Sequence, residues 1–193
     1  MVIDDDGWVI DPRVKKTPFF NLKHGLMDVI HGIIVHQTAS PSAQSTFNSY
    51  KSADPNGAHF LIDKDGTIYQ TASVTWKVWH VGKIRSRCLV NYTCTPLEIR
   101  KLKSSSQIQK TEREKKFPDR YPMNEDSLGI EIVSAVIGDE KHPNFETVTD
   151  EQNGSLTWLI SELKQKFSVP PTEIYRHPDV AYKNAHEAES ARW

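Results

Sequence analysis

The chain has 193 residues, of which 37% are hydrophobic and 25% are charged, with 9 glycines and 11 prolines. This length and composition suit one folded domain with a single core, and they exclude collagen-like, low-complexity and wholly disordered chains. The formal net charge of -1 gives no general electrostatic reason to bind nucleic acid, and no apolar stretch approaches the roughly 20 residues of a membrane span.

The N-terminus is acidic, with Asp4, Asp5 and Asp6 in a row and no apolar stretch behind a basic start. A secretory signal peptide needs both a basic start and an apolar stretch. We therefore expect the protein to be made in the cytoplasm and to leave it only by a specialised route.

Four segments predict the strands of a mixed sheet. The stretch 29–36 ends in a β-branched run that is typical of a buried strand. Residues 58–63 and 67–70 flank Asp65-Gly66, which predicts a hairpin because this pair tolerates the positive φ of a tight turn. The stretch 127–133 predicts a further central strand. The expected fold class is α/β, a single domain with a mixed central β-sheet flanked by helices.

Two helices are expected beside these strands. Ser40 is a candidate cap for a helix from Pro41 to Tyr50, because proline is welcome in a first turn and serine satisfies a free amide. Thr149 and Gln152 have the spacing of a capping box and predict a second helix. The apolar residues that would form one face of this second helix are Leu156, Leu159, Ile160, Leu163 and Phe167, before the stop at Pro170-Pro171.

The segment 83–120 differs from the rest of the chain, since it carries 11 basic and 4 acidic residues and few large apolar ones. We predict a charged, mobile insertion on the surface of the 1–193 domain, helical from about Thr95. It is either a solvated face without a partner or a patch that contacts an anionic wall polymer or a partner protein. Cys88 and Cys94 lie in this segment. The sequence does not decide whether they form a small disulfide loop or stay as two free thiols.

Two histidine-containing segments point to metal chemistry. His36 lies where a predicted strand ends, which is where α/β proteins place functional groups. Far along the chain, His177 is followed within ten residues by Lys183, His186 and Glu187. Catalytic zinc needs three protein ligands and one open position, and two histidines with a carboxylate supply such a set.

Glu131 is an anomaly, because it lies between Ile130 and Ile132 in a predicted central strand. Alternation along a strand lets Glu131 face a site while its two neighbours pack in the core. Burying this carboxylate unpaired would be costly, which indicates a cleft, a water or an unseen partner, unless the strand is half-solvated and the side chain exposed.

The segments 34–39, 57–66, 78–82, 127–132 and 176–180, in this order, resemble the zinc-dependent N-acetylmuramoyl-L-alanine amidases. That family includes peptidoglycan-recycling amidases, phage amidases and peptidoglycan recognition proteins. The resemblance implies a mixed sheet with a zinc cleft across the strand ends. It also implies hydrolysis of the amide that joins the lactyl group of N-acetylmuramic acid to the L-alanine of the stem peptide.

The resemblance also implies roles for individual residues. His36 and His177 match the two histidine ligands of zinc, and Glu131 matches the carboxylate that handles the proton of the attacking water. Lys183 matches the basic residue that stabilises the oxyanion. General enzyme chemistry agrees with these roles. Zinc lowers the pKa of a bound water, and a carboxyl in a partly apolar site can serve first as base and then as acid. A basic side chain can stabilise the oxyanion.

The third ligand departs from the family pattern, because Ala185 stands where relatives place an aspartate or a cysteine. We expect Glu187 to take this role, since a carboxylate preserves ligand type and charge. His186 is the nearest alternative and Glu189 a weaker one, and zinc accepts any of these donors.

The resemblance further places Trp79 and His80 beside the substrate groove. His59 is expected to pack beside the site and to orient a neighbouring group. The other histidines considered, His24, His31 and His142, are expected to be structural or on the surface.

The leading functional hypothesis is an active zinc amidase whose partner is peptidoglycan or a muropeptide. Alternatives are a zinc-free peptidoglycan-binding recognition module, and a structural zinc domain whose basic insertion contacts a partner protein. Three settings are open for the enzyme: cytoplasmic recycling, phage lysis, and antibacterial attack. We favour an antibacterial effector that a type VI or similar secretion machine delivers into the periplasm of a target cell, and for which a cognate immunity protein is expected.

Overall fold

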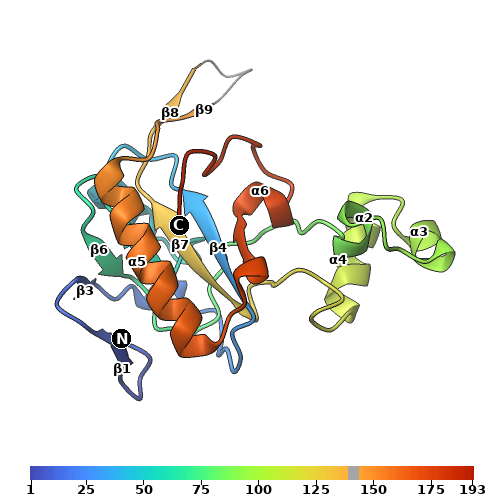
Figure 1. The fold of residues 1–193 in the computed structure, drawn as a ribbon, viewed down its shortest axis with the longest axis horizontal. Helices are drawn as coiled ribbons and strands as arrows, with labels where there is room; N and C mark the ends of the chain where they lie inside the picture. Colours follow the sequence, from blue (N-terminus) through green and yellow to red (C-terminus); the bar gives the residue numbers. More distant parts are fainter. Residues whose placement is uncertain (139–143) are drawn as a thin grey trace.

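A six-stranded mixed sheet forms the centre of the computed structural model, which describes residues 1–138 and 144–193. Figure 1 shows the sheet with the long helix α5 across one face and a group of short helices projecting to one side. The strands, in their order across the sheet, are β10 (Ile174–Arg176), β4 (Gly32–Gln37), β7 (Ser127–Ile132), β5 (Phe60–Ile62), β6 (Ile68–Gln70) and β3 (Val14–Lys16). All neighbouring pairs are parallel except β5 and β6. The single-domain α/β fold with a mixed sheet is therefore confirmed.

The two central strands, β4 and β7, set the position of the site. They pair in parallel with His36 opposite Glu131. Strand β10 runs parallel to β4 on the other side and places Arg176 opposite Val35. His177 directly follows β10, so it reaches the sheet edge at which His36 and Glu131 lie. This edge is formed by the carboxyl ends of three parallel strands, where α/β proteins commonly bind ligands.

The predicted hairpin is present, because β5 and β6 are antiparallel and the chain turns at Gly66 with φ +81°. The helix α5 (Asp150–Phe167) begins at the predicted capping box, where Thr149 and Gln152 bond each other's backbone amides. Its leucines at 156, 159 and 163 are fully buried against the sheet. The helix ends two residues before Pro170, at a left-handed Ser168.

The first predicted helix exists, but its cap was assigned to the wrong serine. Helix α1 (Ala43–Ser49) is capped by Ser42, whose side chain accepts a hydrogen bond from the amide of Ser45. Ser40 lies two residues before this cap, where its amide donates to the carbonyl of Ser134 at 2.7 Å, in a bridge that continues the edge of the sheet.

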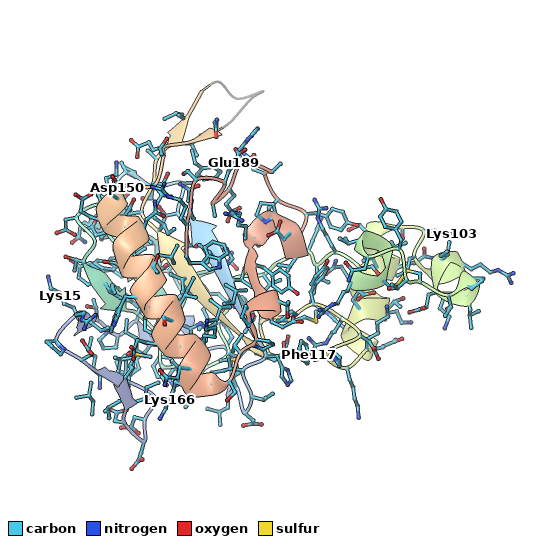
Figure 2. All side chains as sticks on the ribbon, in the orientation of Figure 1. Lys15, Lys103, Phe117, Asp150, Lys166 and Glu189 are labelled. Carbon is cyan, nitrogen blue, oxygen red and sulfur yellow. A yellow bond between two sulfur atoms is a disulfide. The ribbon has the colours of Figure 1, made fainter. Side chains whose placement is uncertain are left out.

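The segment 83–120, called the helical arm below, carries α2 (Arg87–Val90), α3 (Pro96–Lys101) and α4 (Ser105–Glu114). Helix α3 is capped by Thr95, the predicted start, with a capping box to Glu98. The prediction missed α2, which lies before this start. Cys88 and Cys94 form a disulfide with an S–S distance of 2.03 Å. Figure 2 shows this bond inside the arm, whose outer end carries Lys103 and whose base carries Phe117.

The arm has an apolar centre that the sequence did not reveal, where Cys88, Leu102 and Ile108 are buried together. The mobility of the arm and its status as an insertion stay predictions.

Smaller elements complete the fold. Strands β1 (Val2–Ile3) and β2 (Val9–Ile10) pair with each other, as do β8 (Val136–Ile137) and β9 (Asn144–Phe145). The short helices are η1 (Phe20–Leu22), η2 (Pro171–Glu173) and α6 (His177–Val180). Within residues 1–138 and 144–193, no helix is long and apolar enough to cross a membrane.

Candidate metal centre and catalytic cleft

A cavity of about 420 Å³ opens at the carboxyl ends of β4 and β7. Its walls come from segments spread over most of the chain, and they include the seven residues for which the sequence analysis expected a metal, catalytic or substrate-binding role. Those seven residues are His36, Trp79, His80, Glu131, His177, Lys183 and Glu187. The fold therefore gathers the whole predicted set around one cleft.

Three buried side chains in this cleft could hold a metal ion: His36, His177 and Glu187, with one donor atom of each within 4.8 Å of the others. Glu187 Oε1 lies 2.8 Å from His177 Nδ1 and 3.4 Å from His36 Nδ1. The two alternative third ligands lie elsewhere, because His186 and Glu189 are exposed and bond each other at 2.7 Å.

The second ring nitrogen of each histidine is bound by the protein. His177 Nε2 donates to the carbonyl of Val81 at 2.8 Å. His80 Nε2 lies 3.3 Å from the carbonyl of Ser127, so it donates there and leaves His80 Nδ1 as an acceptor for His36 Nε2 at 3.1 Å. His36 and His177 are thereby held in the tautomer that turns an Nδ1 lone pair toward Glu187. Such partners on the far nitrogen are typical of metal-binding histidines.

The chemistry of this group fits a divalent cation. In the tautomers just derived, two nitrogen lone pairs and a carboxylate oxygen converge, and a shared cation would satisfy all three acceptors. Two donors of one tetrahedral zinc ion with bonds of about 2.1 Å lie about 3.4 Å apart. This equals the separation of His36 Nδ1 and Glu187 Oε1, whereas His177 Nδ1 and Glu187 Oε1 lie closer together, at 2.8 Å.

The electrostatics of the same residues agree with this interpretation. Burial and the neighbouring His177 together lower the pKa of His36 to about 4. Burial alone would raise the pKa of Glu187, but the neighbouring His177 and His36 hold it at about 2. The site therefore presents a neutral His36 and an ionised Glu187 at neutral pH, which are the forms that bind metal.

Glu131 lies at the floor of the cleft with its carboxylate poorly satisfied. Its Oε2 is inaccessible to solvent and has no hydrogen-bond partner among the described residues. Burial raises the pKa of Glu131 to about 8, and the charge of Glu187 contributes to this rise while that of Lys183 opposes it. A carboxyl whose pKa lies near neutrality can both accept and return a proton in one reaction cycle.

Lys183 lies at the mouth of the cleft, where its side chain is exposed. It passes over Gly82, since a Cβ placed on this glycine would lie 3.7 Å from Lys183 Cε. Gly82 has φ +71°, a conformation that other residues rarely adopt. The glycine therefore keeps the space beneath the ammonium group open.

Trp79 and His80 occupy different positions in the cleft. Trp79 is exposed and stacks on His24, with ring centroids 3.7 Å apart and planes within 8°. His80 is buried behind His36, so it supports a ligand rather than facing open solvent. His59 is buried too, and bonds the carbonyl of Trp76 and the amide of Gly129.

His31 and His142, which were expected to be structural or on the surface, add nothing to the cleft in the part of the chain that the structure describes. His31 lies at the surface and pairs with Asp126 at 2.9 Å. His142 lies outside the residues that the structure describes.

The sequence analysis missed three residues that shape the cleft. Gln37 accepts a hydrogen bond from the amide of Ala188, and so anchors the segment that carries Glu187. Asn124 accepts from the amides of His80 and Val81, and so fixes the carbonyl that orients His177. His24 braces Trp79. None of them has a sequence signal, although Gln37 directly follows a predicted ligand.

Comparison with solved structures identifies the type of fold. The chain aligns with a selenomethionine derivative of AmpD at a TM-score of 0.55 and 17% identity, covering 95% of this chain and 90% of that one. It aligns with the catalytic domain of XlyA at a TM-score of 0.54 and 20% identity, covering 88% and 87%. AmpDh3 from Pseudomonas aeruginosa in complex with anhydromuramic pentapeptide gives 0.55 and 17%, covering 94% and 58%. The protein thus has the fold of this group of proteins.

The family model for N-acetylmuramoyl-L-alanine amidases matches residues 26–190. The chain belongs to this family. A search among curated proteins gave no match. Family membership supports amidase activity on peptidoglycan.

Proposed function

We propose that the protein is a zinc-dependent N-acetylmuramoyl-L-alanine amidase. The observation that carries this proposal is the convergence of His36 Nδ1, His177 Nδ1 and Glu187 Oε1 beside Glu131. His36, His177 and Glu187 would hold the ion. Zinc bound there lowers the pKa of water to about 7 and polarises the scissile carbonyl.

The protein's own groups complete the reaction. Glu131 takes a proton from the attacking water and then delivers it to the amine of the departing L-alanine, which balances the hydrolysis. Lys183 donates to the carbonyl oxygen as negative charge develops on it, a role worth about 3 kcal/mol for comparable donors. The exposed ring of Trp79 offers a flat apolar surface for the substrate, while His80 keeps His36 in the binding tautomer.

Purified peptidoglycan sacculi test this proposal. The metal-replete protein should release stem peptides that begin with L-alanine, chelation should abolish the release, and added zinc should restore it. Intact lactyl–alanine bonds after incubation with zinc-loaded protein would overturn the enzyme proposal. Binding to sacculi by a protein that holds no zinc would instead support a recognition module.

We further propose that the enzyme acts in the periplasm of a target cell, as an antibacterial effector delivered by specialised secretion and neutralised by a cognate immunity protein. The disulfide between Cys88 and Cys94 supports this setting, because disulfides persist in oxidising compartments such as the periplasm and are rare in the cytoplasm.

Directed export tests this setting. A host that exports the wild-type protein to its periplasm should lyse, whereas a host that exports the Glu131→Gln variant should survive. Normal growth of the first host without any protector, at equal amounts of exported protein, would contradict the effector proposal and leave the amidase proposal standing.

A further inference from the structure

A second and larger cavity, of about 730 Å³, adjoins the catalytic cleft. The two cavities share Asn56, Trp79 and Gly82 in their walls, so they adjoin, and the second cavity is called the groove below. The helical arm supplies the far wall through Gln109 and Arg113 of α4. Any substrate that extends past Trp79 and Gly82 therefore meets the arm.

Hydrogen bonds fix the helical arm at the side of this cavity. Gln109 bonds the backbone of Ile84 twice, accepting from its amide at 3.1 Å and donating to its carbonyl at 2.7 Å. Arg113 lies four residues further along α4, so the two side chains share one face of the helix. On the opposite side, Asn124 ties its loop to the amides of His80 and Val81.

The charged residues of this second cavity are mostly basic: Lys83, Arg113 and Arg120 against Glu125. Arg120 is committed to Asp126, which it bonds at 3.0 Å, and to backbone carbonyls. Within the part of the chain that the structure describes, the charged groups of Lys83 and Arg113 have no ion pair or hydrogen bond. Two cations thus face the groove without a protein counter-charge in contact.

The groove has to accept one side of the scissile bond, and the two sides differ in charge. The glycan side carries hydroxyl and acetamide groups and no free carboxylate once the lactyl group is amidated. The peptide side carries free carboxylates on its acidic residue and at its C-terminus. Uncommitted basic side chains bind carboxylates through charge-assisted hydrogen bonds, which are about twice as strong as neutral ones.

We propose that the groove between the helical arm and the loop 120–125 binds the carboxylates of the stem peptide, with Lys83 and Arg113 as the specificity-determining residues. The proposal rests on the amidase function proposed above, and it gives the arm a role in choosing the substrate. Among the described residues of this lining, Glu125 is the one acidic side chain, against the three basic ones.

Direct binding of the free peptide tests the proposal without any need for turnover. The probe is a stem tripeptide with free carboxylates, compared by calorimetry with the same peptide after amidation. The wild type should bind the free acid about tenfold more tightly, and Arg113→Gln combined with Lys83→Gln should abolish this preference. Lys110→Gln is the matched control, because it removes a charge from the same helix outside this cavity. Equal affinity for both peptides, or no binding by the wild type, would overturn the proposal.

Kinetics separate this proposal from the amidase proposal. With a muramoyl-peptide substrate, the double variant should show a raised KM for the acid form and an unchanged kcat. A wild-type protein that binds the peptide but cleaves nothing would refute the amidase function alone. Cleavage with the same KM in the wild type and the double variant would refute the role of the arm alone.

Discussion

The side-chain oxygen of Gln37 accepts a hydrogen bond of 2.7 Å from the backbone amide of Ala188, 151 residues later in the chain. The amide nitrogen of the same side chain donates to the carbonyl of Glu146 at 2.9 Å. Gln37 therefore joins the strand that carries His36 to the segment that carries Glu187. It shares the task of holding that segment with Arg176, which donates to the carbonyl of Ala188 at 2.9 Å.

Removing the bridge should weaken metal binding without removing a ligand. We expect Gln37→Ala to lower zinc affinity about 10- to 100-fold, as for other residues that support metal ligands. Gln37→Glu keeps an acceptor for the amide of Ala188 and should therefore lose less zinc affinity than Gln37→Ala. Competition with a chromophoric chelator measures both, and wild-type affinity in Gln37→Ala would show that Glu187 is positioned by other contacts.

Glu131→Gln should separate catalysis from metal binding. The amide keeps the shape of the side chain but is unable to accept or return the proton, so kcat should fall about 10²- to 10⁴-fold. Zinc content should stay equal to that of the wild type, because Glu131 is not one of the three converging donors. Activity within a few-fold of wild type would remove Glu131 from the proposed mechanism.

Arg87 should contribute to stability by connecting the arm to the sheet domain. Its guanidinium bonds both carboxylate oxygens of the buried Glu173, at 2.6 and 3.2 Å. Arg87→Gln leaves that carboxylate without its cation, and should lower the free energy of unfolding by about 2 kcal/mol, less than for a fully buried pair. Arg100→Gln, an exposed change on α3, should stay within about 0.5 kcal/mol. Denaturant unfolding of the two variants measures the difference.

The cap of α3 should weaken in acid. Hydrogen bonds from the Thr95 amide and from Lys115 hold the pKa of Glu98 at about 2, below its ordinary value of 4.5. A lowered pKa stabilises the fold above about pH 4.5, and this stabilisation is lost as the pH falls through 2. Since the carboxylate is at the surface, the effect should stay below about 1 kcal/mol.

Amide exchange of Thr95 reports this cap directly. The rate of hydrogen exchange at this amide is first corrected for its intrinsic pH dependence. In the wild type, the corrected rate should show that the Thr95–Glu98 hydrogen bond opens more often at pH 2.5 than at pH 6. In Glu98→Gln the opening should be the same at both values. An equal pH response in the two proteins would contradict the assigned cap.

The sequence predicted those elements whose signals are local. The hairpin at Gly66 and the capping box at Thr149 each depend on a few adjacent residues, so short-range rules were sufficient. Glu131 stood out because a carboxylate is unusual between two isoleucines, and register then placed it opposite His36.

The features that the sequence did not reveal depend on long-range contacts. Gln37 acts through a residue 151 positions away, and no local pattern marks such a pair. The apolar centre of the arm combines Cys88 with Leu102 and Ile108 from different helices. Ser40 and Ser42 are equivalent as caps by composition, and the structure places Ser40 in a bridge with Ser134 and Ser42 at the start of the helix.

The position of zinc tests the central proposal most directly. Crystals of the metal-replete protein, measured on both sides of the zinc absorption edge, should show one anomalous peak about 2.0–2.2 Å from His36 Nδ1, His177 Nδ1 and a carboxylate oxygen of Glu187. A peak on His186 and Glu189 instead, or no zinc peak in the cleft, would contradict the proposed metal centre.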